Sequence, residues 1–186
     1  MNSIQFLIAT VISVYSFILI LRVWFQLARV DFYNPFSQAL VKATQPVVAP
    51  LSQFAPTVKG VNVAALLACL ILGWVKFPLL NFFGTIAGAS LFEYAVIGVL
   101  SVVHSIGEAI FYVLLVGAIL SWFNRAAGQT QYLLYQLSEP VLRPIRKILP
   151  NTGMIDFSPM VVVFILYLLN RVLYDVFGGL WAVAAF

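Results

Sequence analysis

Four ionisable side chains lie inside long apolar segments of the sequence, where such groups can do chemistry that exposed ones cannot. His104 and Glu108 are one helical turn apart. Arg171 and Asp175 have the same spacing. Counted from the expected inner ends of their segments, Glu108 and Arg171 both lie about 21 to 22 Å up, with Lys76 at a similar height. The four could therefore meet as one polar cluster, which either neutralises itself and fixes helix register or lines a path for ions or protons.

The second group with chemical potential is a basic trio, Arg143, Arg146 and Lys147, in a segment punctuated by prolines. Its spacing places the trio on one side of a helix whose other side is apolar. Ser138 is the expected N-cap of that helix, and Pro140 suits its first position. A short amphipathic helix with a basic face lies in the membrane interface and binds anionic lipid head groups. The trio either anchors the chain by charge alone or docks a phosphate-bearing lipid or an acidic partner.

The sequence carries no pattern typical of catalysis: it has no glycine-rich phosphate loop, no GxSxG, no HExxH and no CxxC. Its one His and one Cys, His104 and Cys69, cannot build a zinc or haem site. Asp156 and Ser158 precede an apolar run, where one of them is expected to cap a helix that has Pro159 near its start. We therefore expect a non-enzymatic protein without a metal, a cofactor or a nucleic-acid partner.

The amino-acid composition indicates whether water or lipid surrounds the folded chain. Of the 186 residues, 63% are hydrophobic and 9% are charged, whereas a soluble domain carries about 25% charged residues. Because a water-soluble fold would expose large apolar patches, the sequence predicts a membrane bundle. Runs of about 20 apolar residues predict four spans, at residues 4–21, 61 to about 78, 102–123 and 157–180. No basic segment precedes the first of them, so we expect a retained span rather than a signal peptide.

An internal repeat organises the spans. Three prolines of the first half recur in the second at a constant offset of 94 residues: Pro46, Pro50 and Pro56 against Pro140, Pro144 and Pro150. The same offset sets Asn62 against Asp156. The fold class expected is therefore an all-α membrane protein of two tandem repeats. Each repeat holds a transmembrane helix, a Pro-rich amphipathic interfacial segment and a second transmembrane helix. Residues 1–80 form the first repeat, 81–101 an apolar connector and 102–186 the second repeat.

The basic residues predict how the repeats face the membrane. Eight of the ten Lys and Arg residues lie in or beside the two Pro segments: Arg22, Arg29, Lys42, Lys59, Arg125, Arg143, Arg146 and Lys147. Basic loops stay in the cytoplasm, so both segments are expected there and both termini in the periplasm. The repeats are then parallel, and the connector is an interfacial helix or an extension of the third span. An inverted arrangement, in which the connector crosses, is the alternative.

The motifs in this chain resemble the signature of the YggT family of small bacterial inner-membrane proteins. The resemblance is strong in the second repeat, at residues 120–123, 138–150 and 153–159, and weaker in the first, at 21–25, 31–35 and 44–46. It implies the longer, two-copy form of the family. Ala49 and Ser52 stand where the second copy has Arg143 and Arg146, so any site that needs those charges belongs to the second copy.

The resemblance implies no particular reaction. Members of the family are associated with tolerance of osmotic stress and ion imbalance, with plastid and cell division, and with haem attachment in plastids. Two functions stay open for this chain. One is a membrane scaffold or assembly factor that holds lipids or a membrane-protein partner. The other is an ion channel or transporter component, expected to be a homo-oligomer because four spans make a thin wall for a pore.

Overall fold

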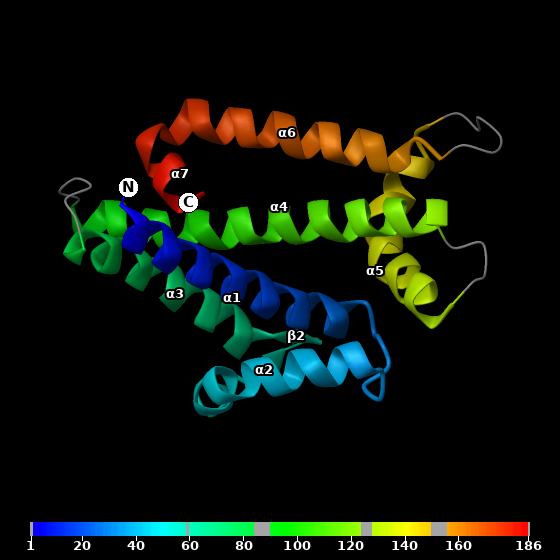
Figure 1. The fold of residues 1–186 in the computed structure, drawn as a ribbon, viewed down its shortest axis with the longest axis horizontal. Helices are drawn as coiled ribbons and strands as arrows, with labels where there is room; N and C mark the ends of the chain where they lie inside the picture. The colour runs from blue at the N-terminus through cyan, green and yellow to red at the C-terminus, as the bar shows by residue number, and fades with distance from the viewer. Residues whose placement is uncertain (1, 59, 84–89, 124–127, 150–155, 186) are drawn as a thin grey trace.

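The computed structural model in Figure 1 describes residues 2–58, 60–83, 90–123, 128–149 and 156–185, with residues 121–123 by their backbone alone. The described chain is mostly helical. Its helices are α1 (Ser3–Leu27), α2 (Pro35–Ser52), α3 (Val63–Phe82), α4 (Leu91–Phe123), α5 (Gln129–Arg146), α6 (Ser158–Phe177) and α7 (Gly179–Ala184). A small antiparallel hairpin, β1 (Thr57–Val58) and β2 (Val61–Asn62), stands between α2 and α3.

Four of the described helices are long and apolar enough to cross a membrane: α1, α3, α4 and α6. The predicted helical fold is confirmed, and these four helices suggest a multi-pass membrane protein. The hairpin is a small departure from the expected all-α fold.

Short polar side chains fix where the spans begin. Asn2 and Gln5 form a capping box at the start of α1. Asn62 accepts a hydrogen bond of 3.0 Å from the Ala65 N–H at the start of α3. At α4, Ser90 and Glu93 bond each other's backbone N–H groups, which makes Glu93 a cap for a helix end whose first N–H groups have no partner in the helix.

The core lies among α1, α3 and α4 (Figure 1). Small residues let these helices approach closely. At the α3–α4 crossing, a Cβ added to Gly73 would lie 3.0 Å from the Gly98 carbonyl oxygen. Farther along, α1 contributes Leu19, Ile20 and Val23, α3 contributes Ala64, Ala65, Ala68 and Cys69, and α4 contributes Ala109.

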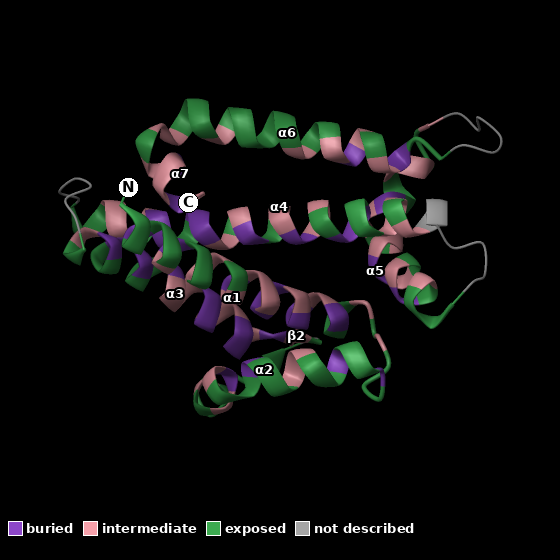
Figure 2. Cartoon of the chain, in the orientation of Figure 1, coloured by how far each residue is buried: buried purple, intermediate pink, exposed green. Residues whose placement is uncertain are grey.

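The second half is packed more loosely than the first. Only 6% of the most apolar part of α6 is buried, against 44% for α3, and Figure 2 shows α6 largely exposed along its length. Near its start, Val162 packs with Leu114 of α4 and Leu142 of α5. Beyond its end, α7 folds back against α4, with Trp181 buried there. Helix α6 is thus held mainly at its two ends.

The two Pro-containing helices, α2 and α5, both contact the C-terminal part of α1, with α2 along the lower edge of the molecule in Figure 1 and α5 at its right. Helix α5 reaches the end of α1, where the Gln136 side chain donates a 2.9 Å hydrogen bond to the Ala28 carbonyl oxygen. Helix α2 reaches α1 through Arg22, which donates to the Thr44 hydroxyl at 2.7 Å. Both helices run through their prolines without a break.

The expectation that Ser138 caps the basic helix is wrong. Helix α5 begins at Gln129, and the Ser138 hydroxyl inside it donates to the Tyr135 carbonyl oxygen at 3.2 Å. The leucines Leu133 and Leu137 before the prolines are buried against Phe25 of α1, and this packing stabilises the extra turns. Pro140 and Pro144 remove two backbone donors but leave the helix intact.

Residues 91–101 form the first turns of α4 and so extend the third span. The rest of the expected connector includes 84–89, which lie outside the described residues. Three other residues used in the sequence arguments, Lys59, Arg125 and Pro150, also lie outside them.

Candidate functional site

The first candidate site is a polar group between α3, α4 and α7. His104 Nδ1 lies 3.8 Å from Glu108 Oε2, one turn along α4. Lys76 of α3 is buried and within electrostatic range of both residues. Its ammonium donates to the Ala184 carbonyl oxygen at 3.4 Å and to the Ser13 hydroxyl at 3.3 Å. Lys76 therefore ties α1, α3 and α7 together and places a positive charge at the negative end of α7.

A cavity of about 320 Å³ opens beside this group, between α4 and α6. His104 and Glu108 line it from α4, and Tyr167 and Asn170 line it from α6. Trp181 closes one side, with its indole N–H donating to Asn170 Oδ1 at 2.8 Å and its ring edge-on to His104 at 5.6 Å. The cavity is lined mostly by apolar side chains, and the ionisable groups His104 and Glu108 on its α4 side could hold an ion or a proton.

The structure does not bring the four predicted residues into one cluster. Arg171 and Asp175 pair with each other at 3.2 Å on the outer side of α6, where their side chains are 66% and 57% exposed. Neither lines the cavity that holds His104 and Glu108. The sequence estimate compared only the depths of the two pairs in the membrane. Whether the pairs meet depends also on the rotation of α6 about its own axis, which turns Arg171 and Asp175 away from α4.

The second candidate site is the end of α5, where the basic trio divides into two roles. The Arg146 guanidinium pairs with Glu139 on its own helix and with Asp156 at the start of α6, its Nε lying 2.9 Å from Asp156 Oδ2. Arg143 and Lys147 are exposed, and neither has an ion-pair partner in the described part of the chain. Arg146 therefore joins α5 to α6, and the other two cations face outward.

The Arg146–Asp156 pair changes the acidity of both groups. Partial burial alone would raise the pKa of Asp156, but hydrogen bonds from Ser158 and Arg146 outweigh it and hold that pKa below its ordinary value. Burial alone would lower the pKa of Arg146, but the bonds to Asp156 and Glu139 raise it. Both groups are thus held in their charged forms.

Asp156 also caps α6. Its Oδ1 accepts a 2.9 Å hydrogen bond from the Ser158 backbone N–H, the first residue of the helix, and Pro159 follows in the first turn. Of the two caps considered from the sequence, Asp156 supplies the bond and Ser158 is buried. One carboxylate thus starts α6 and binds it to α5.

Sequence reasoning missed a third polar group, around Arg22 in the first repeat. Arg22 is buried although it carries a charge, and it bonds Thr44 and Gln45 of α2. From the sequence alone, Arg22 contributes only to the distribution of basic residues. A usable signal was the polar pair Thr44–Gln45 directly before Pro46, because polar residues beside a span end need a partner.

Among the described residues, no group of three or more His, Cys, Asp or Glu side chains could hold a metal ion. The two sites can hold helices together, bind an anionic group at Arg143 and Lys147, or hold an ion or proton beside Glu108.

Comparison with known proteins identifies a family and several relatives that the chain resembles. The profile of the CCB3/YggT family matches it in two segments, residues 1–83 and 96–177. A Haemophilus influenzae protein described as uncharacterized is 52% identical over 177 residues, covering 95% of this chain and 94% of its own length. The protein YggT of Escherichia coli, also described as uncharacterized, is 45% identical over 170 residues, covering 91% and 88%. No solved structure matches the chain significantly. By both the profile and these relatives, the chain belongs to the CCB3/YggT family.

Proposed function

We propose that this protein is a non-enzymatic scaffold or assembly factor of the bacterial inner membrane that supports the response to osmotic stress or ion imbalance. In this role α6 receives a transmembrane helix of a partner protein. The observation that carries the proposal is the Arg171–Asp175 pair, which lies exposed on the outside of a helix that is apolar enough to span the membrane.

Charged side chains inside membrane spans usually face the interior of a bundle, because lipid solvates them poorly. Arg171 lies about 20 Å from the start of α6 at 1.5 Å per residue, beyond the middle of the span. The surrounding surface of α6 is apolar, with Phe164, Leu168 and Val172 exposed. A partner helix with a polar residue at this depth would cover the apolar face and solvate the ion pair.

The orientation proposed for this role places α2 and α5 at the cytoplasmic face and both termini in the periplasm. Arg143 and Lys147 then face the anionic head groups of the inner leaflet. The two tandem segments matched by the family profile and the contact of both α2 and α5 with the C-terminal part of α1 support parallel repeats. Each exposed cation contributes about 1 kcal/mol to attachment at an anionic surface.

Photo-crosslinking in cells tests the partner. A photoreactive amino acid replaces Phe164 of α6, which is 65% exposed, and in a matched control it replaces Phe6 of α1, which is 66% exposed. We expect protein crosslinks from position 164 that disappear in Arg171→Leu/Asp175→Leu, and none from position 6. Crosslinks to a second copy of this chain would identify the partner as itself. Crosslinks to lipid alone at position 164 would refute the scaffold.

The cavity beside Glu108 favours a second candidate function, passage of ions in an oligomer. His104 and Glu108 line it, and Lys76 lies within electrostatic range. The test is potassium and proton flux through liposomes that contain the purified protein, with and without an osmotic gradient, beside Glu108→Gln. Flux that changes in the variant would establish the path, whereas tight liposomes in every condition would exclude it.

A further inference from the structure

The environment of Arg22 differs from that of every other buried or half-buried cation in the described chain. Arg146 has two carboxylate partners, and Lys76 has Glu108 within electrostatic range. Arg22 is only 8% exposed, yet no carboxylate of the described residues pairs with it. Its guanidinium bonds two neutral groups, the Thr44 hydroxyl at 2.7 Å and the Gln45 amide oxygen at 3.1 Å. A buried charge without a counter-ion is costly, so this position calls for an anion.

The first repeat has neutral side chains at the positions where the second repeat has its bridging carboxylates. At the offset of 94 residues, Gln45 corresponds to Glu139 and Asn62 to Asp156. In the second repeat those two carboxylates neutralise Arg146. In the first repeat both positions are neutral amides, and the amide of Gln45 bonds Arg22. Arg146 itself corresponds to Ser52, so the first repeat has neither the cation nor the carboxylates of this bridge, and Arg22 gains no counter-ion from the repeated positions.

Two polar atoms beside Arg22 lack partners. Arg22 Nε and the Ser37 hydroxyl are both buried without a hydrogen bond to any described residue. Both residues line the same cavity of about 570 Å³, between the end of α1, the start of α2 and the hairpin. Ser37 lies in the first turn of α2, an 18-residue helix, whose dipole favours an anion there. Buried polar groups are almost always satisfied, so two such atoms at one cavity indicate a ligand.

The nearest acidic residue along the chain does not fill this role. Asp31 is exposed, and its carboxylate accepts a hydrogen bond of 2.9 Å from the Tyr33 backbone N–H. Asp31 does not line the cavity. The anion must therefore come from outside the described chain.

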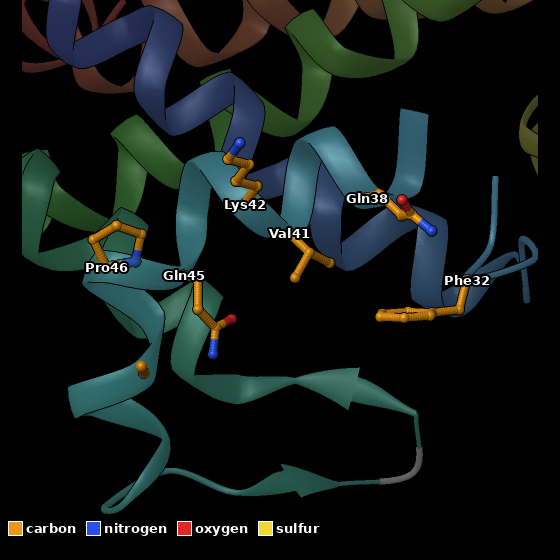
Figure 3. A pocket seen from close by; sticks show the side chains of 7 residues that line it. Phe32, Gln38, Val41, Lys42, Gln45 and Pro46 are labelled. Carbon is orange, nitrogen blue, oxygen red and sulfur yellow. The ribbon is translucent and has the colours of Figure 1, made fainter. Parts of the chain in front are cut away.

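An apolar hollow continues from the cavity. A neighbouring space of about 560 Å³ shares Phe32, Val41 and Gln45 with it and is otherwise walled mostly by apolar atoms, including those of Pro46 and Ala49. Figure 3 shows Val41 and Gln45 pointing from α2 toward the hairpin, with Phe32 facing the same space. A polar end with a guanidinium, joined to an apolar groove, matches an amphiphile with an anionic head and a hydrocarbon tail.

We propose that Arg22, Ser37 and Gln45 form a binding site for the phosphate group of an anionic phospholipid, whose acyl chain follows the groove between α2 and the hairpin. The guanidinium offers its unused N–H donors to the phosphate oxygens, and Ser37 donates its hydroxyl. The site is independent of the partner surface on α6, and it needs neither Arg143 nor Lys147.

Lipid retention measured by native mass spectrometry tests the site. The full chain is purified in detergent with added phosphatidylglycerol or, separately, phosphatidylcholine, and the bound lipid is counted. We expect one tightly retained phosphatidylglycerol on the native protein. Retention should fall at least tenfold in Arg22→Gln and several-fold in Ser37→Ala. The control Arg143→Gln, which removes the same charge from an exposed position, should retain the lipid.

Ser37→Ala keeps the test decisive if Arg22→Gln fails to fold, because the Ser37 hydroxyl makes no internal hydrogen bond and its loss leaves the fold intact. Equal retention of both lipids, or retention of phosphatidylglycerol that Ser37→Ala does not change, would overturn the proposal. A second arm adds inorganic phosphate and follows the thermal midpoint. A phosphate-induced rise of the same size as that from the lipid, lost in Ser37→Ala, would overturn the lipid assignment in favour of free phosphate.

Discussion

Three cations in the described part of the chain are buried or half-buried, and each is compensated differently. Lys76 bonds the carbonyl end of a short helix and has a carboxylate within range. Arg146 bridges two carboxylates. Arg22 bonds neutral side chains only. These differences separate a charge that holds two helices together from one that needs a ligand.

The Arg146 bridge predicts a specific loss of stability. Arg146→Leu leaves Glu139 and Asp156 without their shared partner and should loosen the attachment of α5 to α6. Because all three side chains are about one-third exposed or more, we expect a loss of only about 1 kcal/mol in the free energy of unfolding. Denaturation of the purified protein in mixed micelles measures it. Arg143→Leu is the control, and an equal loss there would refute the bridge.

The same bridge predicts a dependence on pH. The pKa of Asp156 is lower in the folded protein than its ordinary value, which is about 3.9. Its stabilising contribution is therefore complete above about pH 4 and is lost as the pH falls through the lower, folded pKa. We expect the thermal midpoint of the native protein to fall in this acidic window more steeply than that of Asp156→Asn. Parallel curves for the two proteins would show that the carboxylate contributes nothing.

At the scale of helices, the contact of α3 with α4 is closest at Gly98. A Cβ at Gly98 would lie 1.9 Å from Cδ1 of the Trp74 ring, and the indole N–H of Trp74 bonds the Ala95 carbonyl oxygen at 3.3 Å. Gly98→Ala must displace this ring or separate the helices, so we expect a loss of about 1 to 3 kcal/mol.

The matched control lies on the same helix. A Cβ at Gly107 would meet no atom within 4 Å, and Gly107→Ala should therefore be neutral or stabilise α4 by up to about 1 kcal/mol. Thermal unfolding followed by circular dichroism measures both variants. If Gly98→Ala and Gly107→Ala unfold alike, the close approach of α3 and α4 is not required.

Sequence reasoning predicted the spans well because apolar length in a membrane protein is a strong constraint. It also predicted a cap at Asp156 or Ser158 for the start of α6, and the structure gives the capping bond to Asp156. It failed where tertiary contacts override local rules. Prolines suggested a late start for the basic helix, yet buried leucines extend α5 to Gln129.

The candidate site was less predictable than the spans. The i, i+4 pairs His104–Glu108 and Arg171–Asp175 could be read from spacing, and both are present. Whether the pairs face each other depends on the rotation of α6 about its axis. This rotation is set by packing against other helices and cannot be deduced from residue spacing within α6. The hydrogen-bond partner of Arg22 is equally hard to predict, because Thr44 lies on another helix, 22 residues away in the sequence.

For the molecule as a whole, parallel repeats make a prediction about sidedness. With Cys69 replaced by Ala, a cysteine is introduced at Ser52 in α2 or at Arg143 in α5, both of which are exposed. We expect a membrane-impermeant maleimide to label both from the cytoplasmic side only. Inside-out and right-side-out vesicles provide the measurement. Labelling of the two positions from opposite sides would instead establish inverted repeats.

Helix α4 has 33 residues, which at 1.5 Å each give a length of about 50 Å. The hydrocarbon layer of a bilayer is about 30 Å thick. The helix must therefore tilt or extend beyond this layer, and any thinning of a stretched bilayer changes the balance between the two. Since α1, α3, α5, α6 and α7 all pack on α4, a change in its tilt is felt by every other span. Bilayer tension that changes the tilt of α4 would therefore shift the helices packed against it.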